Sequence, residues 1–92
     1  MPKFNQARIK SALRAVPEWK KRGREITRLY QFKNFVAAMK FVNHVARLAE
    51  KAGHHPDIDI RWNQVSLVLS THSEGGLTAK DFKLAKQIDR IA

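Results

Sequence analysis

The sequence of 92 residues contains no cysteine, which excludes disulfide bonds and thiolate metal sites. No apolar run approaches the roughly 20 residues that cross a bilayer, and the first residues lack the apolar segment of a secretory signal. Acidic residues are few, because 8 Asp and Glu stand against 18 Lys and Arg, which gives a formal charge of +10. We therefore expect a single domain over residues 1–92, cytoplasmic and without a membrane segment.

The excess of positive charge could attract a polyanion. Basic residues gather in one segment, at Lys20, Lys21, Arg22, Arg24 and Arg28. No zinc-finger spacing, ribonucleoprotein signature or row of stacking aromatics accompanies them. We interpret this segment as a solvated basic hairpin and do not expect a nucleic-acid partner. The alternative function is a basic, dimerising module that binds nucleic acid or a transcription factor.

The N-terminal part of the chain predicts one helix and two strands. Apolar side chains recur at helical spacing over residues 5–16, where Asn5 is a suitable cap. Residues 19–22 and 25–32 have an approximate period of two, which indicates strands. They would join across Gly23, because glycine tolerates the positive φ that tight turns need.

The longest helix is predicted from its cap, Asn34, to about Ala52, where Gly53 suits a left-handed C-terminal position. Its apolar residues form two stripes. The first stripe, which can pack on a sheet, consists of Phe35, Ala38, Met39, Val42, Val45, Ala46 and Ala49. The second stripe consists of Ala37, Phe41, His44 and Leu48.

The second stripe needs a cover of its own. We predict that it forms a contact between the subunits of a homo-oligomer, either a dimer or a tetramer, to which Phe41 and Leu48 contribute. The alternative is that the N-terminal helix covers this stripe. His44 lies on it and is interpreted as an interface or core histidine rather than as a ligand.

Residues 57–62 and 65–70 alternate between apolar and polar side chains, which is typical of strands with one buried face. The two residues between these runs, 63–64, predict the turn of a β-hairpin. In this register Ile60 pairs with Leu67, and the large apolar residues share one face.

Three histidines are expected at the open end of this hairpin. The register places His55 opposite His72, and directly paired side chains have Cβ atoms roughly 5 Å apart. His54 lies beside them in the sequence. Imidazole gives and takes protons near neutral pH, so this cluster is a candidate site for acid–base catalysis.

The C-terminal segment predicts the last helix, because Thr78 and Asp81 have capping-box spacing and Leu77 can pack on Phe82 as a hydrophobic staple. Residues 73–76 before it predict a flexible loop. The resulting element order, α-β-β-α-β-β-α, has hairpins but few helical crossovers. It favours an α+β fold: a four-stranded antiparallel sheet with three helices on one face.

Several short segments follow one another at a characteristic spacing. They are Tyr30 to Phe35, Ala46 to Lys51, His54-His55-Pro56, Trp62, Leu69-Ser70-Thr71-His72, Gly76-Leu77-Thr78 and Asp81. Their ordered spacing covers most of the chain and closely resembles the pterin-4a-carbinolamine dehydratase family (4a-hydroxytetrahydrobiopterin dehydratase). The resemblance implies the same α+β architecture that the pattern predicts.

The resemblance implies a lyase that dehydrates 4a-hydroxytetrahydropterin (pterin-4a-carbinolamine) to quinonoid dihydropterin and water, in tetrahydrobiopterin recycling. The leaving hydroxyl must gain a proton and the ring nitrogen must lose one, and histidines can carry out both proton transfers. No metal or organic cofactor is implied, since the nitrogen lone pair drives the expulsion. Members of the family form dimers and dimers of dimers, and some are also dimerisation cofactors of a transcription factor.

The family's pterin site, carried onto this chain, consists of Gly53, His54, His55, Ser70, Thr71 and His72. We assign His54 and His72 to general acid–base catalysis. We assign His55 to orienting the pterin, with a share in proton transfer. Backbone groups and the hydroxyls of Ser70 and Thr71 would bind the amide and amino edge of the pterin.

The resemblance leaves alternatives open at several positions. Family members often have an aspartate at the position of Gly53, so that carboxylate contact is lost here. Glu50 and Asp81 match acidic positions near the family's site, but Glu50 could be an exposed helix end and Asp81 only a helix cap.

The three histidines could instead hold zinc with an open position for water. We expect no metal, because His54 and His55 are consecutive on an extended segment and point to opposite sides.

Overall fold

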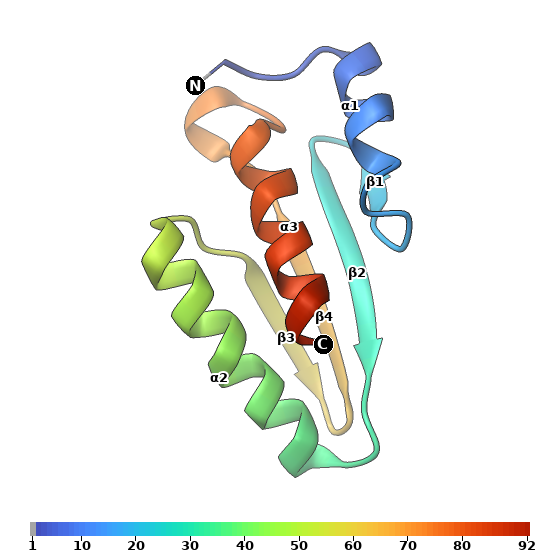
Figure 1. Cartoon of the computed structure of the whole chain (residues 1–92), viewed down its shortest axis with the longest axis vertical. Coiled ribbons are helices and arrows are strands. Elements are labelled where there is room, and N and C mark those ends of the chain that lie inside the picture. The colour runs from blue at the N-terminus through green and yellow to red at the C-terminus, as the bar shows by residue number, and fades with distance from the viewer. Residues whose placement is uncertain (1) are drawn as a thin grey trace.

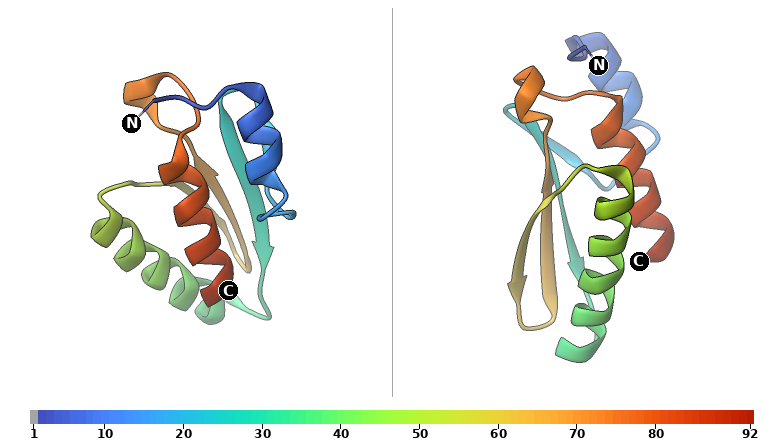
Figure 2. Two further views of the ribbon diagram at one scale, coloured as in Figure 1. Left: turned by 45° about the horizontal axis from the view of Figure 1, so that its top comes forward. Right: turned by 90° about the vertical axis from the view of Figure 1, so that its left-hand side faces the viewer.

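The computed structural model describes residues 2–92 and contains three helices on one face of a four-stranded sheet (Figures 1 and 2). The helices are α1 (Gln6–Leu13), α2 (Phe35–Ala52) and α3 (Ala79–Ile91). The strands are β1 (Lys20–Arg22), β2 (Glu25–Gln31), β3 (Asp57–Arg61) and β4 (Gln64–Leu69), and a short 3-10 turn, η1 (His72–Glu74), follows β4. The strands pair antiparallel in the order β1-β2-β4-β3. The predicted fold class and element order are therefore confirmed.

The ends of the helices are set by local side chains, as the sequence predicts. Asn5 Oδ1 accepts a hydrogen bond from the backbone N–H of Arg8 at 2.9 Å. Asn34 Oδ1 accepts one from the N–H of Ala37, also at 2.9 Å. α2 ends at Gly53, which has φ 62°, in the left-handed region that favours glycine.

Some elements are shorter than predicted. α1 ends at Leu13 rather than at residue 16, because the chain tightens there and the N–H of Val16 donates to the carbonyl of Leu13, three residues back, at 3.1 Å. β1 begins at Lys20 and β2 ends at Gln31, each one residue inside the predicted strand. Among the helices of residues 2–92, none combines the length and apolarity that crossing a bilayer requires.

Phe41, on the second apolar stripe of α2, belongs to the core of the chain itself. The ring of Phe41 lies 4.7 Å from that of Tyr30 and 4.9 Å from that of Phe32, measured between centroids, and Phe41 is only 5% exposed. The predicted subunit contact through Phe41 is therefore wrong. Cover by α1 is wrong as well, because α3 lies between α1 and α2 (Figure 1). His44 is exposed, so it is not a core histidine.

The β3–β4 hairpin turns one residue earlier than predicted. Its turn is formed by residues 62–63, with φ 50° at Trp62. Ile60 consequently pairs with Val65 and not with Leu67. The predicted register was wrong by two residues, a shift that keeps each side chain on its face, so the apolar pattern could not reveal it.

The corrected register also removes the predicted pairing of His55 with His72. β3 begins at Asp57, which pairs with Val68, so both histidines lie outside the ladder. His72 starts η1 instead, which extends into residues 73–76, the segment predicted to be a flexible loop. The N–H of Thr71 donates to the carbonyl of Gly76 at 3.0 Å, which closes this loop at its base.

A polar cluster joins the C-terminal part of α3 to the sheet. Asp89 Oδ1 accepts hydrogen bonds from Trp19 Nε1 and Arg28 Nη1, both at 2.9 Å, and from the hydroxyl of Tyr30. Burial, and then the hydrogen bond to Asp89, raises the pKa of Tyr30 well above its usual range. Arg28 therefore belongs to this packed cluster and not to a solvated basic hairpin.

Candidate active site

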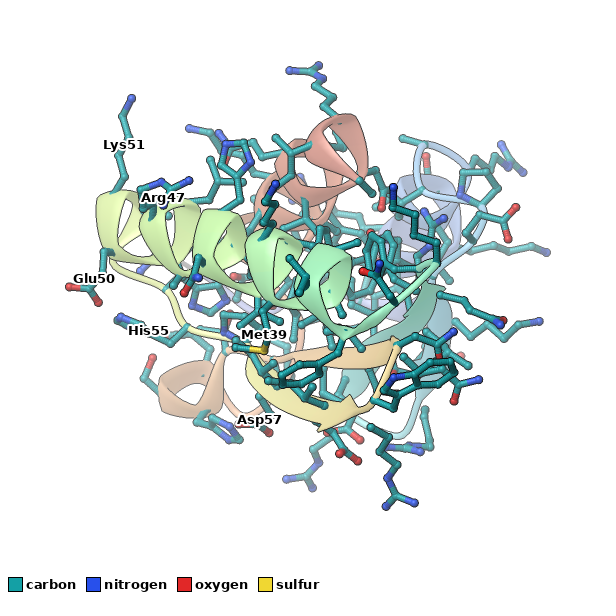
Figure 3. All side chains as sticks on the ribbon, turned by 90° about the horizontal axis from the view of Figure 1, so that it is seen from below. Met39, Arg47, Glu50, Lys51, His55 and Asp57 are labelled. Atoms are coloured by element: carbon teal, nitrogen blue, oxygen red, sulfur yellow. The ribbon has the colours of Figure 1, made fainter. Side chains whose placement is uncertain are left out.

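The loop after α2 sends two adjacent histidines to different neighbours. The N–H of Gly53 donates to the carbonyl of Glu50 at 3.2 Å, and the N–H of His54 donates to that of Ala49 at 3.1 Å. This pair of hydrogen bonds is the Schellman motif, which ends helices at a residue in the left-handed conformation. His54 then lies against α3, whereas His55 lies on the outer side of the loop, next to Glu50 (Figure 3).

His54 forms the most buried contact of this loop. Its Nε2 lies 2.6 Å from Asp81 Oδ1. The side chain of Asp81 is fully buried, and that of His54 is 11% exposed. Asp81 is therefore more than a helix cap, because it holds the imidazole ring in one orientation.

The second carboxylate oxygen of Asp81 is held by α3 and by the end of β4. Its Oδ2 accepts from the backbone N–H of Thr78 at 2.9 Å and from the hydroxyl of Thr71 at 2.8 Å. The hydroxyls of Thr71 and Thr78 lie 2.9 Å apart. The predicted capping box is present, and it fixes the carboxylate that faces His54.

These contacts assign the protons of the His54 ring. A carboxylate that already accepts two hydrogen bonds is an acceptor, so Nε2 of His54 carries the hydrogen that faces Asp81. In the neutral ring the other nitrogen, Nδ1, then has a free lone pair. Within residues 2–92, Nδ1 of His54 forms no hydrogen bond. No buried side-chain nitrogen in these residues lacks a partner, so Nδ1 must be open to solvent. Nδ1 can therefore accept a proton from a ligand.

His55 and Glu50 form a second pair, on the surface. Their Nε2 and Oε2 atoms are 2.5 Å apart, and the side chains are 63% and 77% exposed (Figure 3). A surface pair this exposed contributes about 0–1 kcal/mol to folding. The pair can therefore change at little cost to the fold, which suits a contact with a ligand.

The remaining predicted site residues lie at the end of β4 and beyond it. Ser70 Oγ donates to the carbonyl of Arg24 at 2.9 Å. Thr71 is buried, whereas His72 is exposed. No three His, Asp or Glu side chains within residues 2–92 are grouped so that they could share a metal ion. The alternative zinc site therefore has no ligand set in this part of the chain.

A cavity of about 500 Å³ lies between α2 and α3, and His54 is in its wall. We call it the α2–α3 groove. It is lined by Leu48, Lys51, Ala52, His54, Ala79, Lys80, Lys83, Leu84 and Gln87. Three further hollows of 410–420 Å³ adjoin α1, and none of the predicted site residues lines them.

Sequence reasoning missed two features of this region. The first is that Thr78 orients the carboxylate of Asp81 toward His54. The capping-box spacing could have suggested this role, since the cap fixes where that carboxylate points. The lysines of the groove went unnoticed. Lys80 and Lys83 stand three residues apart, a spacing that places both on one side of a helix.

Comparison with known proteins identifies one family. The family model described as pterin 4 alpha carbinolamine dehydratase matches residues 2–91. A protein of Chloroflexus aurantiacus named "Putative pterin-4-alpha-carbinolamine dehydratase" is 55% identical over 91 residues, which cover 99% of this chain and 98% of that protein. A protein of Nocardia farcinica with the same name is 54% identical over 89 residues, 97% of this chain and 94% of that protein.

Solved structures agree with this family. A Brucella melitensis protein described as a transcriptional coactivator/pterin dehydratase superposes with a TM-score of 0.94 at 38% identity, over 98% of both chains. A pterin dehydratase-like protein described as a RuBisCO assembly factor of the alpha-carboxysome has a TM-score of 0.68 at 20% identity, over 80% of this chain and 86% of that one. The second likeness shows the shared fold alone.

Proposed function

This chain belongs to the pterin-4a-carbinolamine dehydratase family, and on that premise we propose that it is a hydro-lyase that removes water from a 4a-hydroxytetrahydropterin. In this reaction the bond between C4a and its hydroxyl oxygen breaks, and the hydroxyl takes up a proton and leaves as water. N5 loses its proton as the double bond between C4a and N5 forms. The product is quinonoid dihydropterin, and the cellular role is the recycling of a tetrahydropterin cofactor, without a metal or organic cofactor in the dehydration itself.

The observation that carries the proposal is His54, which lies in the wall of a cavity and is held from behind by the buried carboxylate of Asp81. We assign His54 as the base that takes the proton from N5, through its free Nδ1. The carboxylate of Asp81 stabilises the positive charge that the ring then acquires. Asp81 is thus a positioning residue, and Thr71 and Thr78 hold it in place.

We assign the proton for the leaving hydroxyl to His72, whose side chain is exposed and follows Thr71 directly. His55, paired with Glu50 on the surface, orients the pterin ring. The hydroxyls of Thr71 and Ser70 already donate within the protein, to Asp81 and to a backbone carbonyl. Backbone groups from Gly53 and from residues 70–72 therefore bind the amide and amino edge of the pterin.

An absorbance assay of dehydration tests this function. A 4a-hydroxytetrahydropterin is generated in the cuvette, and its decay is followed with and without the protein. We expect the protein to accelerate the decay. His54→Ala and His72→Ala should each slow turnover by about 100-fold or less, the low end for acid–base groups, since the uncatalysed reaction is already easy. His44→Ala, on the exposed side of α2, is the control that should keep full activity.

A chain that leaves the decay rate unchanged would show that the family's fold is present without its chemistry. The variants must first be shown to be folded by circular dichroism. Combining His54→Ala with His72→Ala should cost less than the product of the single losses, because the two residues serve one step.

We further propose that the chain forms a homo-oligomer through the edge strand β3. Ile58 and Ile60 pair with the buried Leu67 and Val65, yet they are 38% and 37% exposed. Trp62, at the adjoining turn, is 67% exposed. A free strand edge with apolar neighbours is a ready surface for pairing with another chain.

Sedimentation of the wild-type protein at micromolar concentration should show a species larger than a monomer, and Ile58→Lys should shift the distribution toward the monomer. A wild-type monomer would remove this proposal.

The alternative function is a basic binding module, which the exposed Lys20, Lys21 and Arg22 of β1 and the description of the Brucella protein favour. If this charge is only solvated surface, duplex DNA binds weakly and with a steep salt dependence. Tight, sequence-selective binding at physiological salt would support the module. Replacing these three residues by glutamine should leave dehydration unchanged.

A further inference from the structure

We infer that the pterin used by this chain carries an anionic side chain, such as a phosphate ester, and that the lysines of the α2–α3 groove bind it. The inference rests on the proposed dehydration, because it takes the pterin to be bound at His54. His54 is in the wall of the groove, so a substituent of a pterin at this residue can enter it.

The charge of the groove is positive and uncompensated. Lys51 from α2 and Lys80 and Lys83 from α3 line it, and no carboxylate does. Within residues 2–92, none of these lysines forms an ion pair. Three cations around one cavity repel one another, and an anion bound between them would relieve that repulsion.

The nearby acidic side chains are turned elsewhere. Glu50 extends from the side of α2 opposite to Lys51 and meets His55 (Figure 3). Asp81 is fully buried, and its two oxygens are taken up by His54, Thr71 and the N–H of Thr78. Neither carboxylate is therefore available to neutralise the lysines.

The rest of the groove suits the carbon skeleton of a side chain. Four apolar residues line it: Leu48, Ala52, Ala79 and Leu84. Its volume of about 500 Å³ falls within the range of roughly 300–1,000 Å³ that ligand pockets occupy. An apolar wall beside three cations matches a short carbon chain that ends in a phosphate or carboxylate.

Binding of three fluorescent, fully oxidised pterins tests the inference directly. One carries a neutral hydroxyalkyl side chain, the second carries the same chain as a phosphate monoester, and the third ends in a carboxylate. Titration of the wild-type protein should show tighter binding of the two anionic pterins, and this preference should fall as salt is raised, because exposed charges are screened. The stronger of the two anionic probes identifies the class of anion.

Two lysine variants and two matched controls locate the effect. Lys51→Gln and Lys83→Gln should each reduce the ratio of anionic to neutral affinity by about fivefold, the upper range for one exposed charge pair. Lys40→Gln on α2 and Lys86→Gln on α3 make the same change of charge outside the groove. They should leave the ratio unchanged.

The same ratio can be measured for turnover, with phosphorylated and neutral 4a-hydroxytetrahydropterins. Equal wild-type values of kcat/KM for the two substrates, together with equal binding of the three pterins, would overturn the inference while leaving the dehydratase function intact. Loss of the preference in the Lys40 and Lys86 controls would also overturn it, because the effect would then come from net charge. Failure of the proposed function is distinct, since neither substrate would be dehydrated.

Discussion

His54 Nε2 and Asp81 Oδ1 lie 2.6 Å apart, although the two residues are 27 positions apart in the chain. The contact joins the loop after α2 to the first turn of α3. It commits one imidazole nitrogen to the protein and leaves the other for a ligand.

Asp81→Asn should reverse the tautomer of His54. The amide oxygen must replace Oδ2 as the acceptor for Thr78 and Thr71, so the amide NH₂ faces Nε2 of His54, which then becomes an acceptor. The proton moves to Nδ1, and the base is lost. Turnover should fall by about 10- to 100-fold, with a small change in KM. Nitrogen-15 chemical shifts of the imidazole would report the tautomer. An unchanged tautomer together with full turnover would show that Asp81 serves only as a cap.

Thr71→Val should weaken both stability and turnover, because it removes the hydroxyl that donates to Asp81 Oδ2 at 2.8 Å. The expected loss of stability is about 1–3 kcal/mol, as for a buried acceptor left without its donor. Thr71→Ser should restore turnover. Thr27→Val is the matched control, since it deletes a hydroxyl that donates to the carbonyl of Leu67, away from the site. Equal loss of turnover in that control would mean that the effect is only structural.

His55→Ala should raise KM more than it lowers kcat, because His55 has the orienting role. Glu50→Gln should do the same to a smaller extent, since it removes the partner of His55 Nε2. Both side chains are exposed, so urea unfolding should be within about 0.5 kcal/mol of wild type. Steady-state kinetics on the 4a-hydroxytetrahydropterin separates the two constants. A fall in kcat at unchanged KM would instead assign His55 to proton transfer.

Tyr30 should make the protein lose stability in alkali. Its pKa is raised in the folded protein from the ordinary 10.0, first by burial and then by Asp89. The folded state thus keeps a proton that the unfolded chain releases. The stabilisation is complete below pH 10 and is lost as the pH rises toward the folded pKa. Between pH 8 and 11, urea unfolding should show about 1 kcal/mol more loss for wild type than for Tyr30→Phe. Parallel curves for the two proteins would contradict this.

Patterns within single elements predicted the fold well. The caps at Asn5 and Asn34, the end of α2 at Gly53 and the capping box of α3 all follow from residues close together in the sequence. Each of these features is made by hydrogen bonds within one helical turn, so it can be predicted from neighbouring residues. The predicted α+β class followed from their order.

The apolar patterns of the sequence could not decide which neighbour covers each face of a helix or which residues pair across the hairpin. Phe41 and Val45 lie on different predicted stripes, yet both are buried, because the sheet and α3 together cover a wider face of α2 than one stripe. The hairpin register slipped by two residues for a related reason. Both registers bury the same side chains, and the choice depended on the backbone at Trp62.

Residue type, spacing and the family resemblance were enough to propose His54, His55, His72 and Asp81 as candidate site residues. The tertiary structure alone decided how they are paired. It turned His54 toward Asp81 and His55 toward Glu50, and it removed His72 from the expected pairing. Such pairings depend on how α3 packs beside the end of α2. That packing is the joint result of many apolar contacts across the core, and no local pattern in the chain encodes it.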